Sequence, residues 1–155
     1  MERRAGSTRN PTDAALVASR SLVAIAARSL AALDDVTLPQ YRALVLLASH
    51  GPSTSGDLAT RLDVHPSTVT RLVDRLDRKG LVVRSGTEDR REVRVEVSPS
   101  GIDLLDAVTR TRRSELGAVM RRLPPDRRRA VVEAFAEFAE AAGEVPDDEW
   151  WIAFG

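Results

Sequence analysis

Short hydroxyl and arginine side chains follow Pro66 at helical spacing, and together they suit contact with DNA. They are Ser67, Thr68, Thr70 and Arg71, followed by Arg75 and Arg78. Hydroxyls of this size let a backbone approach a groove floor, and Arg71 has the fork to span the O6 and N7 of a guanine. Arg75 and Arg78 are better placed for phosphates, and a helix N-terminus offers free N–H groups to anions. Each residue alone is typical of a solvated surface, and helix pairs of this shape also bind proteins. As a group they favour DNA.

The residues before this helix have the spacing of a helix-turn-helix. Such a unit needs a small residue where the two helices cross, and Ala59 occupies that position. The turn needs a residue that tolerates the left-handed backbone region, and Asp63 is the second-best kind after glycine. Thr54 with Asp57 three residues later is a weak capping box, which places the helix start there. Apolar residues surround the predicted crossing at suitable spacing: Leu58, Leu62, Val64, Val69 and Leu72.

A charged hairpin is predicted directly after the second helix, which Gly80 ends. Residues 81–84 are β-like, and the valines of 93–97 alternate with charged residues, as in a strand with one buried face. The tip carries Asp89, Arg90 and Arg91. One arginine can enter the negative minor groove, and the neighbouring Asp89 can hold that guanidinium in a bidentate pair. The alternative is a charged turn that only protects a strand edge. Its place after a helix-turn-helix favours the minor groove.

Two helices are predicted before this central unit. Asp13 to about Asp34 lacks Gly and Pro, and Leu16, Val23 and Leu30 repeat every seven residues along one apolar stripe. Thr37 is the expected N-cap of a helix that ends at His50. The buried face expected for that helix is Leu38, Tyr41, Leu44, Val45, Leu47 and Ala48.

Two more helices are predicted after the hairpin, over 99–123 and 126–142. Ser98 caps the first, and Pro124-Pro125 ends it. Long apolar stripes cannot be buried against a small central unit alone, so we expect the terminal helices to pack on each other and on a second subunit. The fold class is mainly α with a small β-hairpin wing. The residues expected to be buried in the last helix are Val131, Val132, Phe135, Phe138 and Ala142.

Composition excludes several classes of protein. The 155 residues suit one domain, and the absence of cysteine excludes disulfides, iron–sulfur clusters and thiol switches. Basic and acidic residues number 23 each, yet nine basic and six acidic residues lie within 61–94, while 144–149 carries four acidic ones. Zero net charge therefore hides a basic centre and an acidic tail. No glycine-rich phosphate loop, nucleophile elbow or metal-ligand spacing is present, so we expect no enzyme activity and no cofactor.

The chain resembles the MarR family of bacterial transcriptional regulators over roughly residues 12–142. The resemblance rests on T-L-P-Q-Y-R-A-L, D-L-A-T-R-L, P-S-T-V-T-R-L-V-D-R-L-D-R-K-G-L-V-V-R, the D-R-R at the predicted hairpin tip, and V-S-P-S-G. It implies a winged helix-turn-helix in a homodimer bound to double-stranded DNA. Helix 66–79 would enter the major groove, with Arg91 in the minor groove and Asp89 as its orienting partner. The implied organisation is a flexible tail at 1–11, a helical dimerisation region at 12–36 and 99–142, a winged helix-turn-helix domain at 37–98, and an acidic and aromatic tail at 143–155.

Members of this family usually repress, and many release DNA when a small aromatic or anionic ligand binds between the two regions. The missing cysteine removes thiol sensing. With only His50 and His65 present, zinc sensing is not expected. His65 is interpreted as a helix-start or phosphate-contact residue and His50 as structural. The candidate effector region is where Tyr41 and Arg42 meet the first helix and the start of the 99–123 helix, although Tyr41 in the core is the alternative.

We expect a cytoplasmic protein without membrane contact. No apolar run approaches about 18 residues, the length of a membrane span, and the N-terminus lacks the apolar stretch of a signal peptide. The function predicted is a ligand-responsive repressor that binds a pseudo-palindrome as a homodimer. The alternative is a winged-helix module that binds proteins and no longer binds DNA.

Overall fold

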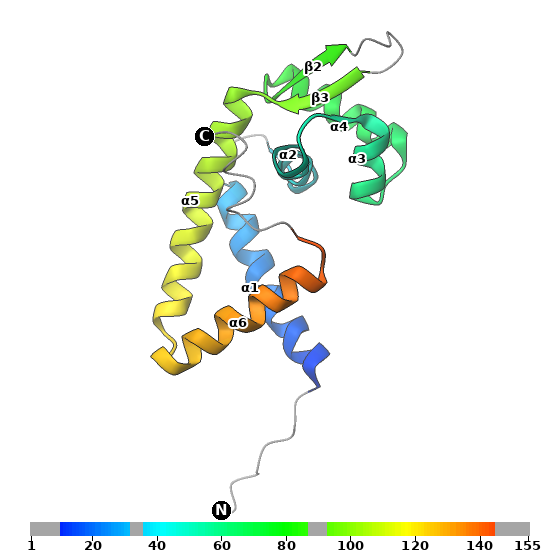
Figure 1. Ribbon diagram of the computed structural model, residues 1–155. Coiled ribbons are helices and arrows are strands. Elements are labelled where there is room, and N and C mark those ends of the chain that lie inside the picture. The colour runs from blue at the N-terminus through cyan, green and yellow to red at the C-terminus, as the bar shows by residue number, and fades with distance from the viewer. Residues whose placement is uncertain (1–9, 32–35, 87–92, 145–155) are drawn as a thin grey trace, which may run out of the picture.

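The computed structural model describes residues 10–31, 36–86 and 93–144, and Figure 1 shows their arrangement. A compact unit of short helices and strands sits at one end, and two long helices run away from it. The elements in order are α1 (Pro11–Ala31), α2 (Leu38–His50), β1 (Ser53–Thr54), α3 (Ser55–Leu62), α4 (Pro66–Arg78), β2 (Val82–Gly86), β3 (Val93–Val97), α5 (Pro99–Arg121) and α6 (Pro125–Ala141). This is the predicted order, apart from β1.

The strands form a small antiparallel sheet in the order β1-β3-β2. Strand β3 pairs with β2 from Val97 opposite Val82 to Val93 opposite Gly86. The wing was predicted as a two-stranded hairpin, and Ser53-Thr54 was assigned to the start of a helix. Thr54 is the N-cap of α3, as predicted, but Ser53 and Thr54 also pair with β3 before the helix begins, and this short strand was not predicted. A two-residue strand has no periodicity of its own to reveal it.

The core lies in the compact unit and is built from α2, α3, α4, the sheet and the first half of α5, with Leu30 from the end of α1. Its fully buried side chains include Leu44, Leu47, Leu58, Val69 and Leu76. Leu38, predicted on the buried face of α2, is 54% exposed, because it is the first residue of the helix and lines an open cavity. Val64, predicted at the helix crossing, is also exposed, because the turn after α3 directs it away from the core.

Gly101 permits the close contact that joins α5 to the compact unit. The N-terminus of α5 is capped by Ser98, whose hydroxyl accepts from the Gly101 N–H and donates to the Gly80 carbonyl. A side chain at Gly101 would come within 2.3 Å of the Leu81 carbonyl oxygen. A residue without Cβ is therefore needed for α5 to reach the sheet here.

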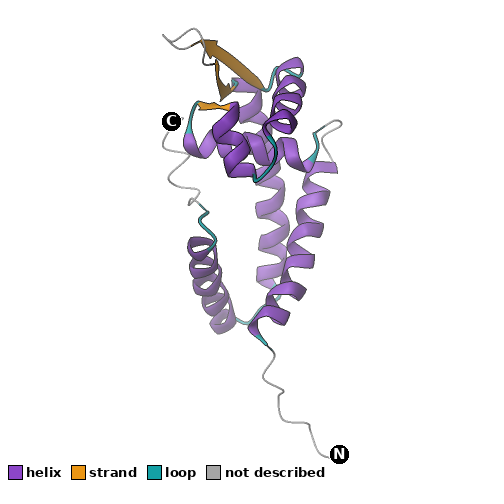
Figure 2. Ribbon diagram, turned by 90° about the vertical axis from the view of Figure 1, so that its right-hand side faces the viewer, coloured by secondary structure: helices purple, strands orange, loops and turns teal. Residues whose placement is uncertain are grey.

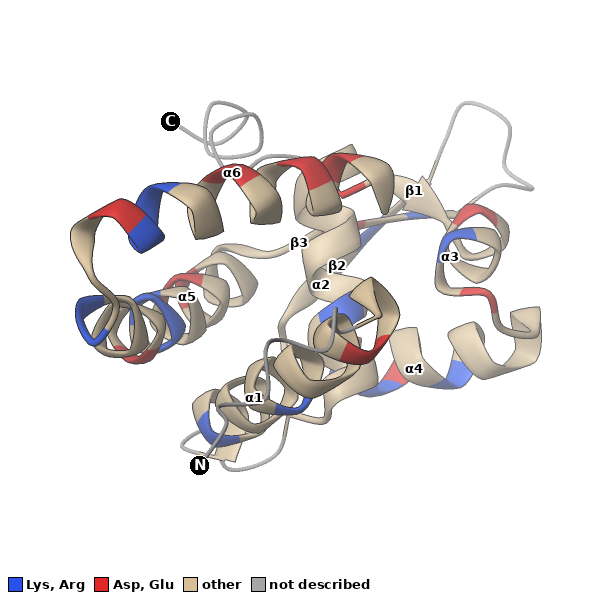
Figure 3. Ribbon diagram, turned by 90° about the horizontal axis from the view of Figure 1, so that it is seen from below, with Lys and Arg blue, Asp and Glu red and all other residues tan. Residues whose placement is uncertain are grey.

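Helices α1 and α5 lie side by side, joined by an ion pair between Arg28 and Glu115. Helix α6 stands apart from them in the views of Figures 2 and 3, and none of its residues is buried. The predicted stripe of α1 is buried at Leu30 but not at Leu16 or Val23, and the residues predicted to be buried in α6 are not buried in a single chain. Val23 is 61% exposed and Phe138 63%, because no described segment of this chain covers them. Leu16, Val132 and Phe135 are exposed in the same way.

One helix among the described residues, α1, is long and apolar enough to cross a membrane by length and composition, with a mean hydropathy of 1.4. The apolar residues of α1 do not form one uninterrupted run, because Ser19, Arg20 and Ser21 lie among them. In this structure α1 packs along α5.

Candidate nucleic-acid interface

The turn between α3 and α4 sets the direction of the exposed helix. Asp63 has φ 52° and ψ 49°, the left-handed conformation predicted for it, and its N–H bonds to the carbonyls of Ala59 and Thr60. Ala59 is buried at the crossing of the two helices, as the sequence predicts. The left-handed step ends α3 and directs α4 across it. The helix-turn-helix geometry is therefore confirmed at the helix crossing, Ala59, and at the turn, Asp63.

His65 caps α4 and contacts Ser67, the first of the candidate DNA-binding residues on this helix. The Nδ1 atom of His65 accepts from the Ser67 N–H at 3.3 Å and lies 2.9 Å from the Ser67 Oγ. Because an N–H can only donate, Nδ1 is the acceptor, and in the neutral ring the proton is on Nε2. The prediction that His65 is a helix-start residue is confirmed. His50 is structural, with Nδ1 3.1 Å from the Leu46 carbonyl oxygen.

Helix α4 has one buried and one exposed face. Val69, Leu72, Val73 and Leu76 are buried in the core. The candidate DNA-binding residues all lie on the exposed side: Ser67, Thr68, Thr70, Arg71, Arg75 and Arg78. The Thr70 hydroxyl donates to the Pro66 carbonyl, and the Arg78 Nε donates to the Asp74 carbonyl, so these two side chains are partly held by the helix itself.

Arg84 on β2 fixes the wing against α4, a role that was not assigned from the sequence. Its guanidinium contacts the Asp74 carboxylate at 2.5 Å and the Asp77 carboxylate at 3.1 Å. Both acidic residues of α4 are therefore paired with a cation from the wing. The pairing offsets their charge, and the basic side chains dominate the exposed face. The only sequence signal was the last arginine of G-L-V-V-R, which alone does not reveal its partner.

The predicted wing tip, Asp89, Arg90 and Arg91, lies outside the described residues. The strand pair on either side is described up to Gly86 opposite Val93. The tip residues therefore belong to the connection between these two paired positions.

Thr54 and Asp57 form the predicted capping box at the start of α3. The Asp57 N–H donates to the Thr54 Oγ1 at 3.1 Å, and the Asp57 carboxylate accepts from the Thr54 hydroxyl and N–H. These hydrogen bonds, chiefly the one from the hydroxyl, lower the pKa of Asp57 below its ordinary value of 3.8, and the charges of Arg61 and Arg94 act in the same direction. The cap holds α3, and through the turn α4, in place.

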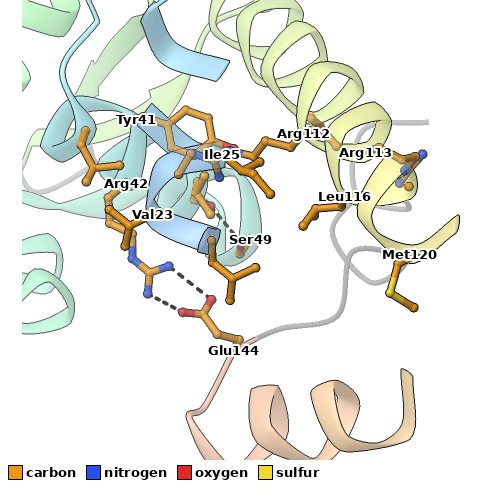
Figure 4. Close-up of a pocket in the computed structure, with 16 residues that line it drawn as sticks. Val23, Ile25, Tyr41, Arg42, Ser49, Arg112, Arg113, Leu116, Met120 and Glu144 are labelled. Carbon is orange, nitrogen blue, oxygen red and sulfur yellow. Dashed lines mark hydrogen bonds and ion pairs between the residues drawn. The ribbon is translucent and has the colours of Figure 1, made fainter. Parts of the chain in front are cut away.

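A second candidate site is an open cavity of about 1010 Å³ between the long helices and α2, shown in Figure 4. Tyr41 and Arg42 line it, as predicted, although Tyr41 is also buried in the core, which was the alternative for this residue. Helix α5 contributes Thr109 to Met120 rather than its start. The start of α5 packs against the sheet through Gly101 and reaches α2 and α1 only further along. The apolar side includes Leu22, Val23, Ile25, Leu116 and Met120, and the polar side includes Arg42, Ser49, Arg112, Arg113 and Glu144.

Two arginines of this cavity have defined partners. Arg112 lies over the Tyr41 ring, and its Nε donates to the Ser29 hydroxyl at 3.0 Å. Arg42 pairs with Glu144, 102 positions along the chain. Neither Arg112 nor Glu144 was assigned to this site from the sequence, because no local spacing connects them to Tyr41. No group of three or more His, Asp or Glu side chains that could hold a metal ion occurs among the residues that the structure describes.

The fold and the exposed face of α4 define a winged helix-turn-helix DNA-binding protein. The family model for the MarR family matches residues 36–93. The uncharacterized HTH-type transcriptional regulator ML2140 of Mycobacterium leprae is 36% identical over 114 residues, which cover 73% of this chain and 80% of that protein. The chain belongs to the MarR family of transcriptional regulators, which are not enzymes.

Two further relatives are similar to this chain. The crystal structure of RV1404 from Mycobacterium tuberculosis has a TM-score of 0.83 and 40% identity, and covers 92% of this chain and 99% of that one. The HTH-type transcriptional repressor MdtR of Bacillus subtilis is 30% identical over 110 residues, which cover 70% of this chain and 71% of that protein.

Proposed function

We propose that this regulator binds a pseudo-palindromic operator as a homodimer and represses transcription from it. The observation that carries the proposal is the exposed face of α4, where hydroxyls near the N-terminus precede arginines, opposite a fully buried face. Ser67, Thr68, Thr70 and Arg71 would contact bases, and Arg75 and Arg78 the phosphates. Half-sites about 10 bp apart would receive the two helices in successive major grooves.

The wing would supply a second contact in the adjacent minor groove. Arg91 would enter it with Asp89 orienting the guanidinium, and Arg90 would lie beside the backbone. The Arg84 pairs with Asp74 and Asp77 support this role, because they hold the wing strand at a fixed distance from α4.

The dimer would form through the helical regions at 12–36 and 99–142, on either side of the 37–98 DNA-binding domain. The support is apolar surface that a single chain leaves uncovered, at Leu16, Val17 and Val23 of α1 and at Val132, Phe135 and Phe138 of α6. Exposed large apolar side chains repeated along a helix favour an interface. A second copy, which carries the same faces, can cover both.

Repression, ligand response and location complete the proposal. Repression is supported by the similarity to MdtR, which is named a repressor. The cavity beside Tyr41 and Arg42 combines apolar walls with arginines, which suits a small aromatic anion. The protein would act in the cytoplasm, where its DNA is, without membrane contact.

A gel shift and a footprint on the upstream region of its own gene test this function. We expect retardation that weakens steeply as salt rises, because phosphate contacts release counterions. Arg91→Ala is expected to weaken binding to all duplexes, with less effect on the preference set by the major groove. Absence of retardation of any duplex at low salt would favour the alternative, a winged helix that binds proteins only.

A further inference from the structure

Glu144 already pairs with Arg42, one of the arginines of the cavity that an anionic ligand could bind. Its carboxylate accepts from two nitrogens of Arg42, with Nη2 to Oε1 at 2.7 Å and Nη1 to Oε2 at 3.3 Å (Figure 4). This two-point arrangement is the geometry in which a guanidinium binds any carboxylate. Glu144 therefore already holds the position that the carboxylate of an aromatic acid would take.

The position of Glu144 is built into the end of α6. Gly143 has φ 73°, and its N–H bonds to the Glu140 carbonyl at 2.9 Å, while the Glu144 N–H bonds to the Ala139 carbonyl at 3.0 Å. This pair of hydrogen bonds is the Schellman motif, in which a left-handed glycine reverses the chain after a helix. The motif fixes the backbone of Glu144, and its side chain then reaches Arg42.

The ion pair is open enough to exchange. The side chains of Arg42 and Glu144 are 45% and 46% exposed, and they lie at the edge of the cavity rather than under its apolar wall. Ion pairs this exposed contribute little to stability because water competes for both charges. An incoming carboxylate with an apolar body gains contact with Leu116 and Met120, which the Glu144 side chain does not provide.

We propose that Glu144 is a built-in competitor that an anionic effector must displace from Arg42. The inference rests on the proposed ligand cavity, and it adds that Glu144 regulates ligand binding there. Arg42 lies on α2 in the DNA-binding domain, and Glu144 lies three residues after the end of α6 of the dimerisation region. Displacement therefore separates the end of α6 from α2, which couples ligand binding to the joint between the two regions.

Calorimetric titration of the full-length dimer with 2-naphthoate tests the competition, with 2-naphthamide as the uncharged probe. Glu144→Gln is expected to bind 2-naphthoate about two- to fivefold more tightly than the wild type, the range of an exposed ion pair. Affinity for 2-naphthamide should not change. Glu140→Gln, an exposed charge loss at the end of the same helix, is the matched control and should bind both probes as the wild type does.

Gly143→Ala is a second test variant, because it keeps the Glu144 carboxylate but strains the turn that positions it. It should also tighten binding of 2-naphthoate. Equal 2-naphthoate affinity in wild type and Glu144→Gln, with weaker binding in Arg42→Gln, would overturn the competition and leave the ligand site standing. If no variant binds 2-naphthoate, the proposed ligand site and the proposed competition are both wrong. The DNA-binding role is tested separately, by the gel shift.

Discussion

The guanidinium of Arg112 lies 4.4 Å from the centroid of the Tyr41 ring. The same side chain donates to the Ser29 hydroxyl on α1, so one cation contacts α1, α2 and its own helix α5. Tyr41 belongs to the compact unit, whereas Ser29 and Arg112 belong to the long helices. This contact therefore joins the two parts of the chain at one point beside the cavity.

Replacing Arg112 with Met keeps much of the side-chain bulk and removes the charge. We expect the free energy of unfolding to fall by about 1–2 kcal/mol, because a cation–π contact and a hydrogen bond are lost together. Chemical denaturation measures the change. Arg110→Met, at an exposed position two residues earlier, should be close to neutral, and an equal loss there would show that charge rather than contact matters.

Arg71→Ala is expected to relax sequence preference and weaken operator binding by about 1–3 kcal/mol. The physical reason is the loss of a bidentate contact with a base edge. Fluorescence anisotropy with the operator and with a scrambled duplex of the same length separates the two effects. Arg129→Ala removes an equal charge from α6, far from α4 along the chain, and is the control. Equal weakening on both duplexes would assign Arg71 to the phosphates instead.

Phe138→Asp is expected to dissociate the proposed homodimer. A phenylalanine that becomes buried between subunits contributes about 1.5–3 kcal/mol for each copy, and a carboxylate in its place adds a desolvation cost. Light scattering over a concentration series measures the mass. Glu137→Ala changes the neighbouring exposed position without removing apolar surface. A variant at Phe138 that stays dimeric at low concentration would place the interface elsewhere.

Gly101→Ala and Gly56→Ala should change stability in opposite directions. At Gly101 the new Cβ would meet the Leu81 carbonyl oxygen and the Val97 side chain, and we expect a loss of about 1–3 kcal/mol. At Gly56, in the first turn of α3, the nearest atom is 3.6 Å away, and a gain of about 0.4–1 kcal/mol is expected from a less flexible unfolded chain. Thermal melts compare them. A harmless Gly101→Ala would contradict the close contact between α5 and the sheet.

Asp57 should make the stability of the protein depend on acid pH. Its pKa in the folded chain is lowered by Thr54, so its stabilising effect is present above the ordinary value of 3.8 and is lost as the pH falls through the lower folded value. The melting temperature of the wild type should exceed that of Asp57→Asn at about pH 6, and the difference should shrink towards about pH 3. A difference that stays constant would show that the carboxylate charge is not involved.

Local chemistry made much of the fold predictable. Asp63 in the turn, Thr54 and Ser98 as caps, and Pro66 and Pro99 at helix starts each depend on near neighbours, and the structure has each of them as expected. Burial was harder to predict where it depends on another element. Val23 and Phe138 look like core residues by periodicity, but no described part of one chain covers them.

The contacts of the candidate sites were the least predictable part. Arg84 pairs with Asp74, and Arg112 with Tyr41, across gaps in sequence that no helical or strand period bridges. A charged residue in an arginine-rich chain has many possible partners, and only the packed structure selects one. The candidate DNA-binding residues of α4 could be predicted because they all lie on one helix.

Thr54 belongs at once to the strand pair with β3 and to the cap of α3. Arg84 joins β2 to α4, so the two strands that flank β3 each contact a helix of the helix-turn-helix. Bending the described wing strands away from α4 would break the Arg84 ion pairs. In the proposed homodimer, we therefore expect an effector to change the separation between the two DNA-binding units, and with it their match to the spacing of the half-sites along the double helix.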